Sequence, residues 1–253
     1  MSIHEKLQRG VERLFFKGKS TKTSSYVAYV IGNIFLMLVL FYLVLNTFAY
    51  GWTGQLYPVG SGFNPSSLSG GLDNAIPFLP QWAIFYVYLF YPTVILTMLF
   101  FGFFAYKRGY ALGWSLVFIN AVAILVYIAF PVSTHWWRAE YLAQPLTGNF
   151  WATEVYNVWA SDTSFNCFPS LHAAVSMACA YAWLQFGKAN SSSVAKIVAG
   201  ISAIIAAGVI LSTLFVKQHY IADEIGGIIL ALAISIVVFR YFQRPKTEIA
   251  KAP

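Results

Sequence analysis

The chain has 253 residues, of which 10% are charged and 58% are apolar, and its formal net charge is +7. An ordinary soluble domain has roughly 25% charged residues, so a soluble globular fold is excluded. The apolar content also excludes a disordered chain. Several apolar stretches reach the roughly 18 residues that a membrane span requires, which predicts an α-helical membrane protein with several spans rather than a transmembrane β-barrel.

Residues 1–25 are polar and basic. Two interpretations of this leader remain open, an amphipathic helix on an anionic membrane face and a mobile basic segment. It does not resemble a secretory signal, because the apolar run after it is too long and has no clear small-residue cleavage site. The residues that recur at helical spacing are Ile3, Leu7, Val11, Leu14 and Phe15.

The remaining chain predicts one all-α integral membrane domain over residues 26–245, followed by a tail over 246–253. Two of its connecting stretches are long. Residues 49–81 are rich in Gly, Pro, Ser and Asn, and residues 132–169 contain four Trp, as an interfacial loop does. We predict six transmembrane helices, at about 26–48, 82–106, 111–131, 170–187, 194–215 and 221–242.

The distribution of basic residues predicts the orientation of these spans. With six spans, all but two of the 16 Lys and Arg residues fall on the side of the termini, so both termini are predicted to be cytoplasmic. The positive charge is then a topology signal and not evidence for nucleic-acid binding. The two exceptions, Arg138 and Lys217, lie on the outer side with His135, His172 and His219. Ionisable groups at membrane depth are functional candidates.

The first motif opens the predicted span at residue 170 and reads Phe168-Pro169-Ser170-Leu171-His172. Proline suits the first turn of a helix. The free N–H groups of that turn favour an anion such as phosphate, and Ser170 and His172 add hydrogen-bond donors. Taken alone, this motif is better explained by an ordinary proline-started helix with an interfacial histidine.

The second motif runs from Ser212 to Asp223. His219 and Asp223 are four residues apart, so on a helix they share a face. A carboxylate there can hold one imidazole nitrogen and leave the other as a nucleophile or base. The alternative is a structural His–Asp pair, which is rarer this close to hydrocarbon.

Together the two motifs resemble the type 2 phosphatidic acid phosphatase (PAP2) superfamily, whose signatures are K-x6-RP, PSGH and SR-x5-H-x3-D. Here the second signature reads Pro169-Ser170-Leu171-His172, and the third reads Ser212-Thr213-x5-His219-x3-Asp223. The sequence of these motifs looks most like that of the branch that contains inositol phosphorylceramide synthases. The resemblance is sharp over residues 165–230, and residues 1–25 and 49–81 lie outside it.

This resemblance implies a metal-independent mechanism without a cofactor. His219 would attack phosphorus and form a phosphohistidine, and Asp223 would orient it. His172 would protonate the leaving oxygen and later activate the acceptor. Ser170, Ser212 and helix amides would bind the phosphate oxygens.

The chain departs from the signatures at its basic residues. Thr213 stands where the family has arginine and is expected among the phosphate-binding residues, and the first signature is absent. Lys217 either replaces the missing arginine or is a snorkelling lysine. Arg138 is the best substitute for the first signature, because arginine recognises phosphate bidentately. Its alternative is stacking on a neighbouring tryptophan.

Four more residues of this region are expected to have structural and not catalytic roles. His135 is expected at the interface, with pairing to substrate as the alternative. Asp162 and Glu154 are expected in a solvated loop, with binding of a polar acceptor as the alternative. Cys167 is expected to pack beside the first motif, and the spacing to Cys179 makes a disulfide between the two unlikely on a helix.

The sequence therefore predicts a lipid phosphate or pyrophosphate phosphatase that works at the outer face of a plasma (inner) membrane. The alternative is a phosphotransferase that passes the head group to a lipid alcohol by the same chemistry. The expected partners are a lipid phosphate and membrane lipids, with no nucleic acid and an oligomeric state that the sequence does not fix. One further class is a zinc enzyme with His135, His172, His219 and Asp223 as ligands. A transporter or channel would carry more ionisable groups in its spans, and the known vanadium haloperoxidases are soluble.

Overall fold

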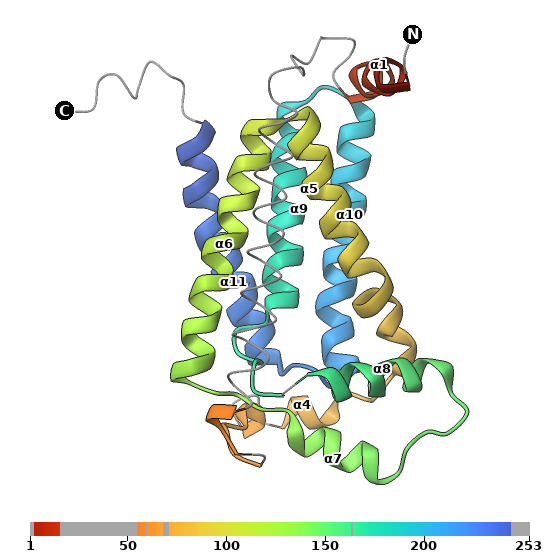
Figure 1. Ribbon diagram of the computed structural model, residues 1–253, viewed down its shortest axis with the longest axis vertical. Helices are drawn as coiled ribbons and strands as arrows, with labels where there is room; N and C mark the ends of the chain where they lie inside the picture. The colour runs from red at the N-terminus through yellow and green to blue at the C-terminus, as the bar shows by residue number, and fades with distance from the viewer. Residues whose placement is uncertain (1–2, 16–54, 59, 68–70, 163, 244–253) are drawn as a thin grey trace, which may run out of the picture.

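The computed structural model describes residues 3–15, 55–58, 60–67, 71–162 and 164–243 (Figure 1). Four of its helices are long and apolar enough to cross a membrane, so the protein is membrane-embedded. The first of these runs over Pro80–Phe104 and comprises a 3-10 turn (η3, Pro80–Trp82), a π-helical stretch (η4, Ile84–Leu89) and α5 (Phe90–Phe104). The long helices that follow are α6 (Tyr106–Ala129), α9 (Leu171–Ala189), α10 (Ser193–Phe215) and α11 (Ile221–Gln243).

These helices coincide with five of the six predicted spans, although α9 is less apolar than the other four. The predicted span at 26–48 and the predicted tail at 246–253 lie outside the described residues, so the count of six and the orientation remain predictions. The predicted spans at 82–106 and 111–131 left residues 107–110 as a loop. This prediction was wrong, because α6 already begins at Tyr106. Gly109 permits this tight turn: a Cβ there would lie 3.0 Å from the backbone carbonyl of Phe101.

Helix α9 occupies the middle of the bundle and packs against α5, α6, α10 and α11 (Figure 1). Alanines on α9 are buried, among them Ala174, Ala178 and Ala182. Small side chains allow neighbouring helix backbones to approach closely in a membrane, where packing replaces the hydrophobic effect as the source of association. Aromatic rings, such as those of Phe101 and Phe186, fill the core near the C-terminal end of α9.

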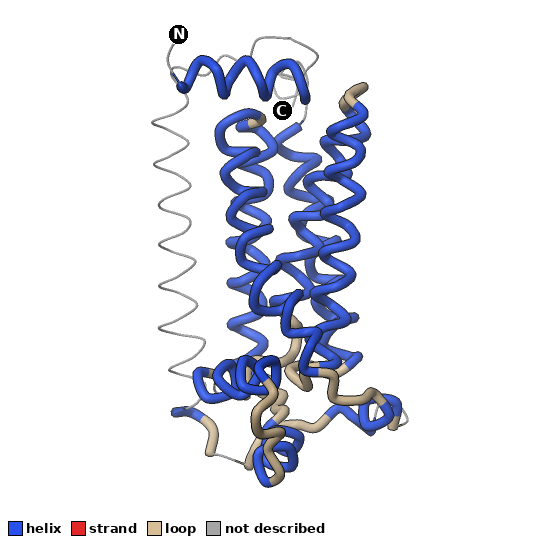
Figure 2. Tube along the Cα trace, turned by 90° about the vertical axis from the view of Figure 1, so that its right-hand side faces the viewer, coloured by secondary structure: helices blue, strands red, loops and turns tan. Residues whose placement is uncertain are grey.

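Helix α1 (Ile3–Phe15) lies across one end of the bundle (Figure 2). The Phe15 ring packs 4.8 Å from the Phe100 ring, and the Ser192 hydroxyl donates to the backbone oxygen of Leu14 at 2.6 Å. Part of the basic leader is therefore helical and docked. Its contact with an anionic membrane face remains a prediction.

A layer of short helices covers the opposite end of the bundle, which we call the site end (Figure 1). It contains α4 (Leu72–Ala75), α7 (His135–Ala143) and α8 (Phe150–Ser161). The stretch 132–169, expected to be an interfacial loop, thus contains two helices. Asn149 caps the second of them, since its side-chain oxygen accepts from the backbone N–H of Ala152 at 3.1 Å.

At the site end, α11 makes an unusually close contact with the segment that enters α9. A Cβ on Gly227 would lie 2.4 Å from the carbonyl oxygen of Ser170, and one on Gly226 would lie 2.6 Å from the Phe168 ring. The backbone N–H of Ser170 also donates to the carbonyl of Asp223 at 3.0 Å. These two glycines therefore set the distance between the two sequence motifs.

Gly227→Ala is expected to destabilise the protein by about 1–3 kcal/mol, because its methyl group overpacks a backbone contact that cannot yield easily. Thermal unfolding in detergent measures this effect. The matched control is Gly200→Ala on α10, where an added Cβ meets no atom within 4 Å. Equal unfolding temperatures for the two variants would contradict the close contact.

Candidate active site

Two histidines from distant parts of the chain face one another at the site end. His172 lies in the first turn of α9, and His219 lies in the turn between α10 and α11. The distance from Nδ1 of His172 to Nε2 of His219 is 3.4 Å. On the other side of the His219 ring, Nδ1 lies 3.5 Å from Oδ2 of Asp223. Both His219 and Asp223 are buried, and the three predicted catalytic residues therefore form one group.

The turn that carries His219 is held by its own backbone. Lys217 has a φ of +56°, which reverses the chain after α10. The N–H groups of Gln218 and His219 both donate to the carbonyl of Thr213, at 2.9 and 3.3 Å. The Asp223 carboxylate accepts from the N–H of Tyr220 at 2.9 Å. Asp223 therefore orients His219 and closes the turn as well.

A side chain from the site-end layer also caps α11. The Oδ1 atom of Asp73 in α4 accepts from the backbone N–H of Ile221 at 2.8 Å. A carboxylate at a helix N-terminus satisfies a free donor and complements the helix dipole. The stretch 49–81, which lies outside the sharp resemblance, thus supports the catalytic turn.

Two aromatic rings from the helix before α6 form a wall beside His172. The ring centroids of Tyr86 and Phe90 lie 4.4 and 4.9 Å from that of His172. Tyr86 belongs to the π-helical stretch at Ile84–Leu89, which directly precedes Phe90. Single π-helical turns often occur at functional sites because they re-aim side chains. Sequence reasoning missed both residues, since nothing distinguishes them within an apolar run.

The electrostatic surroundings of His219 favour its charged form. Burial by itself would lower its pKa, but the neighbouring carboxylates of Asp223, Glu224 and Asp162 outweigh burial and raise the pKa above the ordinary value for histidine. An imidazole that is stabilised as a cation also stabilises the charge that forms when its Nε2 bonds to an electrophile.

Three of the predicted phosphate-binding hydroxyls lie in the same region. Ser170 caps α9, and its Oγ accepts from the N–H of Ala173 at 3.2 Å. The Ser212 hydroxyl donates to the carbonyl of Val209 within α10. The Thr213 hydroxyl lies 2.8 Å from Oε1 of Glu224. Glu224, which directly follows Asp223 in the sequence, is buried.

Arg138 is ion-paired in the structure, and its role in phosphate binding stays a prediction. Its Nη2 atom donates to Oδ2 of Asp162 at 2.7 Å and to Oε1 of Gln218 at 2.6 Å. Gln218 in turn donates to the hydroxyl of Tyr86 at 2.8 Å. The expectation that Asp162 lies in a solvated loop was therefore wrong: the side chain is nearly buried and ion-paired. Burial alone would raise the pKa of Asp162, but Arg138 lowers it below the ordinary value.

The ammonium group of Lys217 is bound to the site-end layer. Its Nζ donates to the carbonyls of Asp73 and Ile76, at 3.1 and 2.5 Å, and lies 4.7 Å from the centroid of the Trp137 ring. This arrangement connects the catalytic turn to α4 and α7. A role for Lys217 in phosphate binding stays a prediction that these contacts do not favour.

His135 lies apart from the catalytic group, with its ring 3.9 Å from that of Trp136. Among the described residues, a potential metal-ligand group consists instead of Cys167, His219 and Asp223, whose ligand atoms lie within 4.8 Å of one another. Burial, the largest cause, raises the pKa of the Cys167 thiol well above its ordinary value. A metal ion bound there would have to displace the thiol proton. The thiol lies 3.2 Å from the carbonyl of Ser164.

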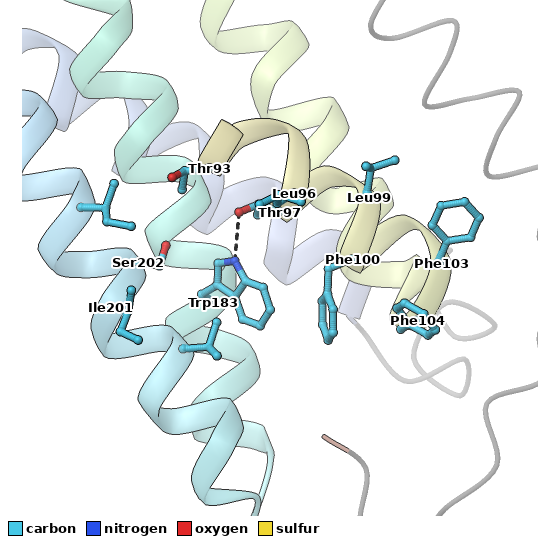
Figure 3. A pocket seen from close by; sticks show the side chains of 12 residues that line it. Thr93, Leu96, Thr97, Leu99, Phe100, Phe103, Phe104, Trp183, Ile201 and Ser202 are labelled. Carbon is cyan, nitrogen blue, oxygen red and sulfur yellow. Dashed lines mark hydrogen bonds between the residues drawn. The ribbon is translucent and has the colours of Figure 1, made fainter. Parts of the chain in front are cut away.

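A cavity of about 530 Å³ lies between α5, α9 and α10, away from the histidines. Its lining is almost entirely apolar, and its few polar groups include Thr97, whose hydroxyl accepts from the Trp183 indole at 3.0 Å (Figure 3). None of the predicted catalytic residues lines this cavity, so it is not the reaction site.

Comparison with known families agrees with the two motifs. The sequence profile of the PAP2 superfamily matches residues 62–237, which include both motifs and most of the described helices. The expectation that residues 49–81 lie outside the resemblance was therefore wrong over residues 62–81. The chain belongs to the PAP2 superfamily. No curated protein and no solved structure shows a significant match to the chain. The more specific resemblance to the inositol phosphorylceramide synthase branch remains a prediction.

Asp162→Asn is expected to lower the stability of this PAP2 protein by about 3–5 kcal/mol, because it leaves the buried Arg138 charge without its carboxylate. The matched control is Glu154→Gln on α8, whose carboxylate accepts a hydrogen bond from the exposed Tyr88 hydroxyl. Unfolding temperatures in detergent compare the two variants. A similar small shift in both would contradict a structural ion pair at Arg138.

Proposed function

We propose that the protein is an integral-membrane phosphatase that removes phosphate or pyrophosphate from a lipid through a phosphohistidine on His219. The observation that carries this proposal is the alignment of Asp223, His219 and His172, with separations of 3.5 and 3.4 Å. A nucleophile held by a third group and facing an acid is the arrangement that covalent catalysis requires. Phosphoesterase activity is general in the PAP2 superfamily, to which the chain belongs.

In the proposed reaction, Nε2 of His219 attacks phosphorus while His172 donates a proton to the leaving lipid oxygen. The two rings separate to admit the phosphoryl group between them. His172 then takes a proton from water, and the water oxygen displaces His219. Asp223 stabilises the imidazolium that forms in the first step.

The proposed phosphate ligands are Ser170, Ser212, Thr213, the first-turn amides of α9 and Arg138. A helix N-terminus favours an anion. Arg138 is included because its buried Nε atom makes no hydrogen bond among the described residues. Lys217 is left out, because two carbonyls of the site-end layer already hold its ammonium group.

We further propose that the site end faces the extracytoplasmic side of a plasma (inner) membrane. The basic residues of the sequence support this orientation, since all but Arg138 and Lys217 fall on the other side in a six-span topology. A lipid head group then reaches the histidines from the outer leaflet. Transfer to a lipid alcohol shares the first half of the reaction, so the test measures both products.

The test incubates purified protein in detergent and chelator with phosphatidic acid, a polyprenyl pyrophosphate, or phosphatidylinositol plus a lipid alcohol. Free phosphate and new lipids are followed together. Release of phosphate is expected from the wild type, loss to background from His219→Ala, and a reduction of about 10²–10⁴-fold from His172→Ala.

The matched control is His135→Ala, which removes an imidazole of the site-end layer that does not contact the catalytic pair, and it should retain activity. Formation of a new phospholipid without free phosphate would show that the protein is a phosphotransferase and not a phosphatase. Inhibition by the chelator would direct attention to the Cys167, His219 and Asp223 group. Product formation that survives His219→Ala would contradict the proposal.

A further inference from the structure

The buried charges at the site are unevenly balanced. Three carboxylates surround His219, those of Asp162, Asp223 and Glu224, and all of them act electrostatically on its ring. Asp162 is ion-paired with Arg138, and Asp223 lies against His219 itself. Glu224 makes no ion pair of its own among the described residues.

The neighbours of Glu224 are neutral hydroxyl groups. Its Oε1 lies 2.8 Å from Oγ1 of Thr213. Ser170 donates its backbone N–H to the carbonyl of the adjacent residue, Asp223, at 3.0 Å. Its second oxygen, Oε2, is buried and has no hydrogen-bond partner in the described structure. The carboxylate therefore stands among the hydroxyls that we propose as phosphate ligands.

The nearby cations do not offset this carboxylate. Arg138 is held by Asp162, and the Lys217 ammonium lies on the carbonyls of Asp73 and Ile76. At this depth, like charges repel much more strongly than they do in water. A phosphate with two negative charges is repelled by an ionised Glu224 about twice as strongly as one with a single charge, since Coulomb energy is proportional to the product of charges.

We propose that Glu224 is a specificity-determining residue that selects singly charged phosphate esters over doubly charged ones. This inference rests on the proposed function and moves the preferred substrate from fully ionised monoesters and pyrophosphates to singly charged phosphate esters. A phosphodiester, or a singly protonated monoester, fits beside the carboxylate and can leave its negative oxygens to Ser170 and the amides of α9. A fully ionised monoester brings two negative charges next to the Glu224 carboxylate and is repelled by it.

The experiment compares two lipids that share one diacylglycerol and differ by a single methyl group, phosphatidic acid and phosphatidylmethanol. At about pH 8 the monoester is mostly doubly charged, because its second pKa is about 6, and the diester carries one charge. Release of diacylglycerol gives kcat/KM for both lipids with the same readout. The wild type should prefer phosphatidylmethanol.

Glu224→Gln removes the charge and keeps the shape of the side chain. It should raise the monoester-to-diester ratio of kcat/KM by about tenfold or more. A tenfold change is the effect of a charge interaction strong enough to shift a pKa by about one unit. Glu224→Ala should shift the ratio in the same direction. The matched control is Glu140→Gln, an exposed carboxylate of α7, which should leave the ratio unchanged.

A second measurement uses the wild type alone, in case both Glu224 variants unfold. Dimethyl phosphate should inhibit more strongly than methyl phosphate at about pH 8, because only the second is doubly charged. Stronger inhibition by methyl phosphate would overturn the inference, as would an unchanged ratio in folded Glu224→Gln. Loss of turnover on both lipids in that folded variant would also overturn it, since Glu224 would then act in catalysis. If no ester is turned over in a His219-dependent way, the proposed function itself fails.

Discussion

The contact between α11 and the entry to α9 is the constraint on which the site depends. Each histidine belongs to a different motif, and this contact brings the two motifs together at the site end. Gly227 and Gly226 leave room for the backbone of Ser170 and the ring of Phe168. A hydrogen bond from Ser170 to the carbonyl of Asp223 then fixes the register between the helices. The 3.4 Å separation of the imidazoles follows from this packing.

The site-end layer stabilises that arrangement from outside the bundle. Asp73 caps α11, Lys217 is bound to α4, and Arg138 of α7 is ion-paired beside Gln218. These contacts connect the catalytic turn to segments that precede it in the chain by between about 80 and 150 residues. The basic residues at this end thus hold the structure together, and the charge left at the reaction centre is correspondingly less positive.

The residues of the proposed catalytic group could be picked out from the sequence because their signals are local. His219 and Asp223 share a helical spacing, and the proline before Ser170 marks a helix start that favours an anion. The long apolar runs likewise predicted the helices. Family resemblance then joined the two motifs, which no local pattern could do.

The partners of these residues could not be predicted, because they depend on tertiary packing. Asp162 and Arg138 are 24 residues apart, and Gln218 and Arg138 are 80 apart. The sequence around Lys217 is the same whether its ammonium group binds phosphate or backbone carbonyls. The position of α4 shows that it binds the carbonyls of Asp73 and Ile76. Tyr86 and Phe90 are ordinary residues of an apolar helix until a π-helical stretch and α9 bring them to His172.

The central claim is that His219 bonds covalently to phosphorus. The most direct measurement is a rapid alkaline quench of the enzyme turning over a lipid phosphate substrate, followed by digestion and mass spectrometry to locate the phosphoryl group. The account predicts a phosphoryl group on a ring nitrogen of His219, stable in base and lost in acid, and absent from His219→Ala. A phosphoryl group on another residue, or turnover in which no phosphoenzyme forms, would contradict it.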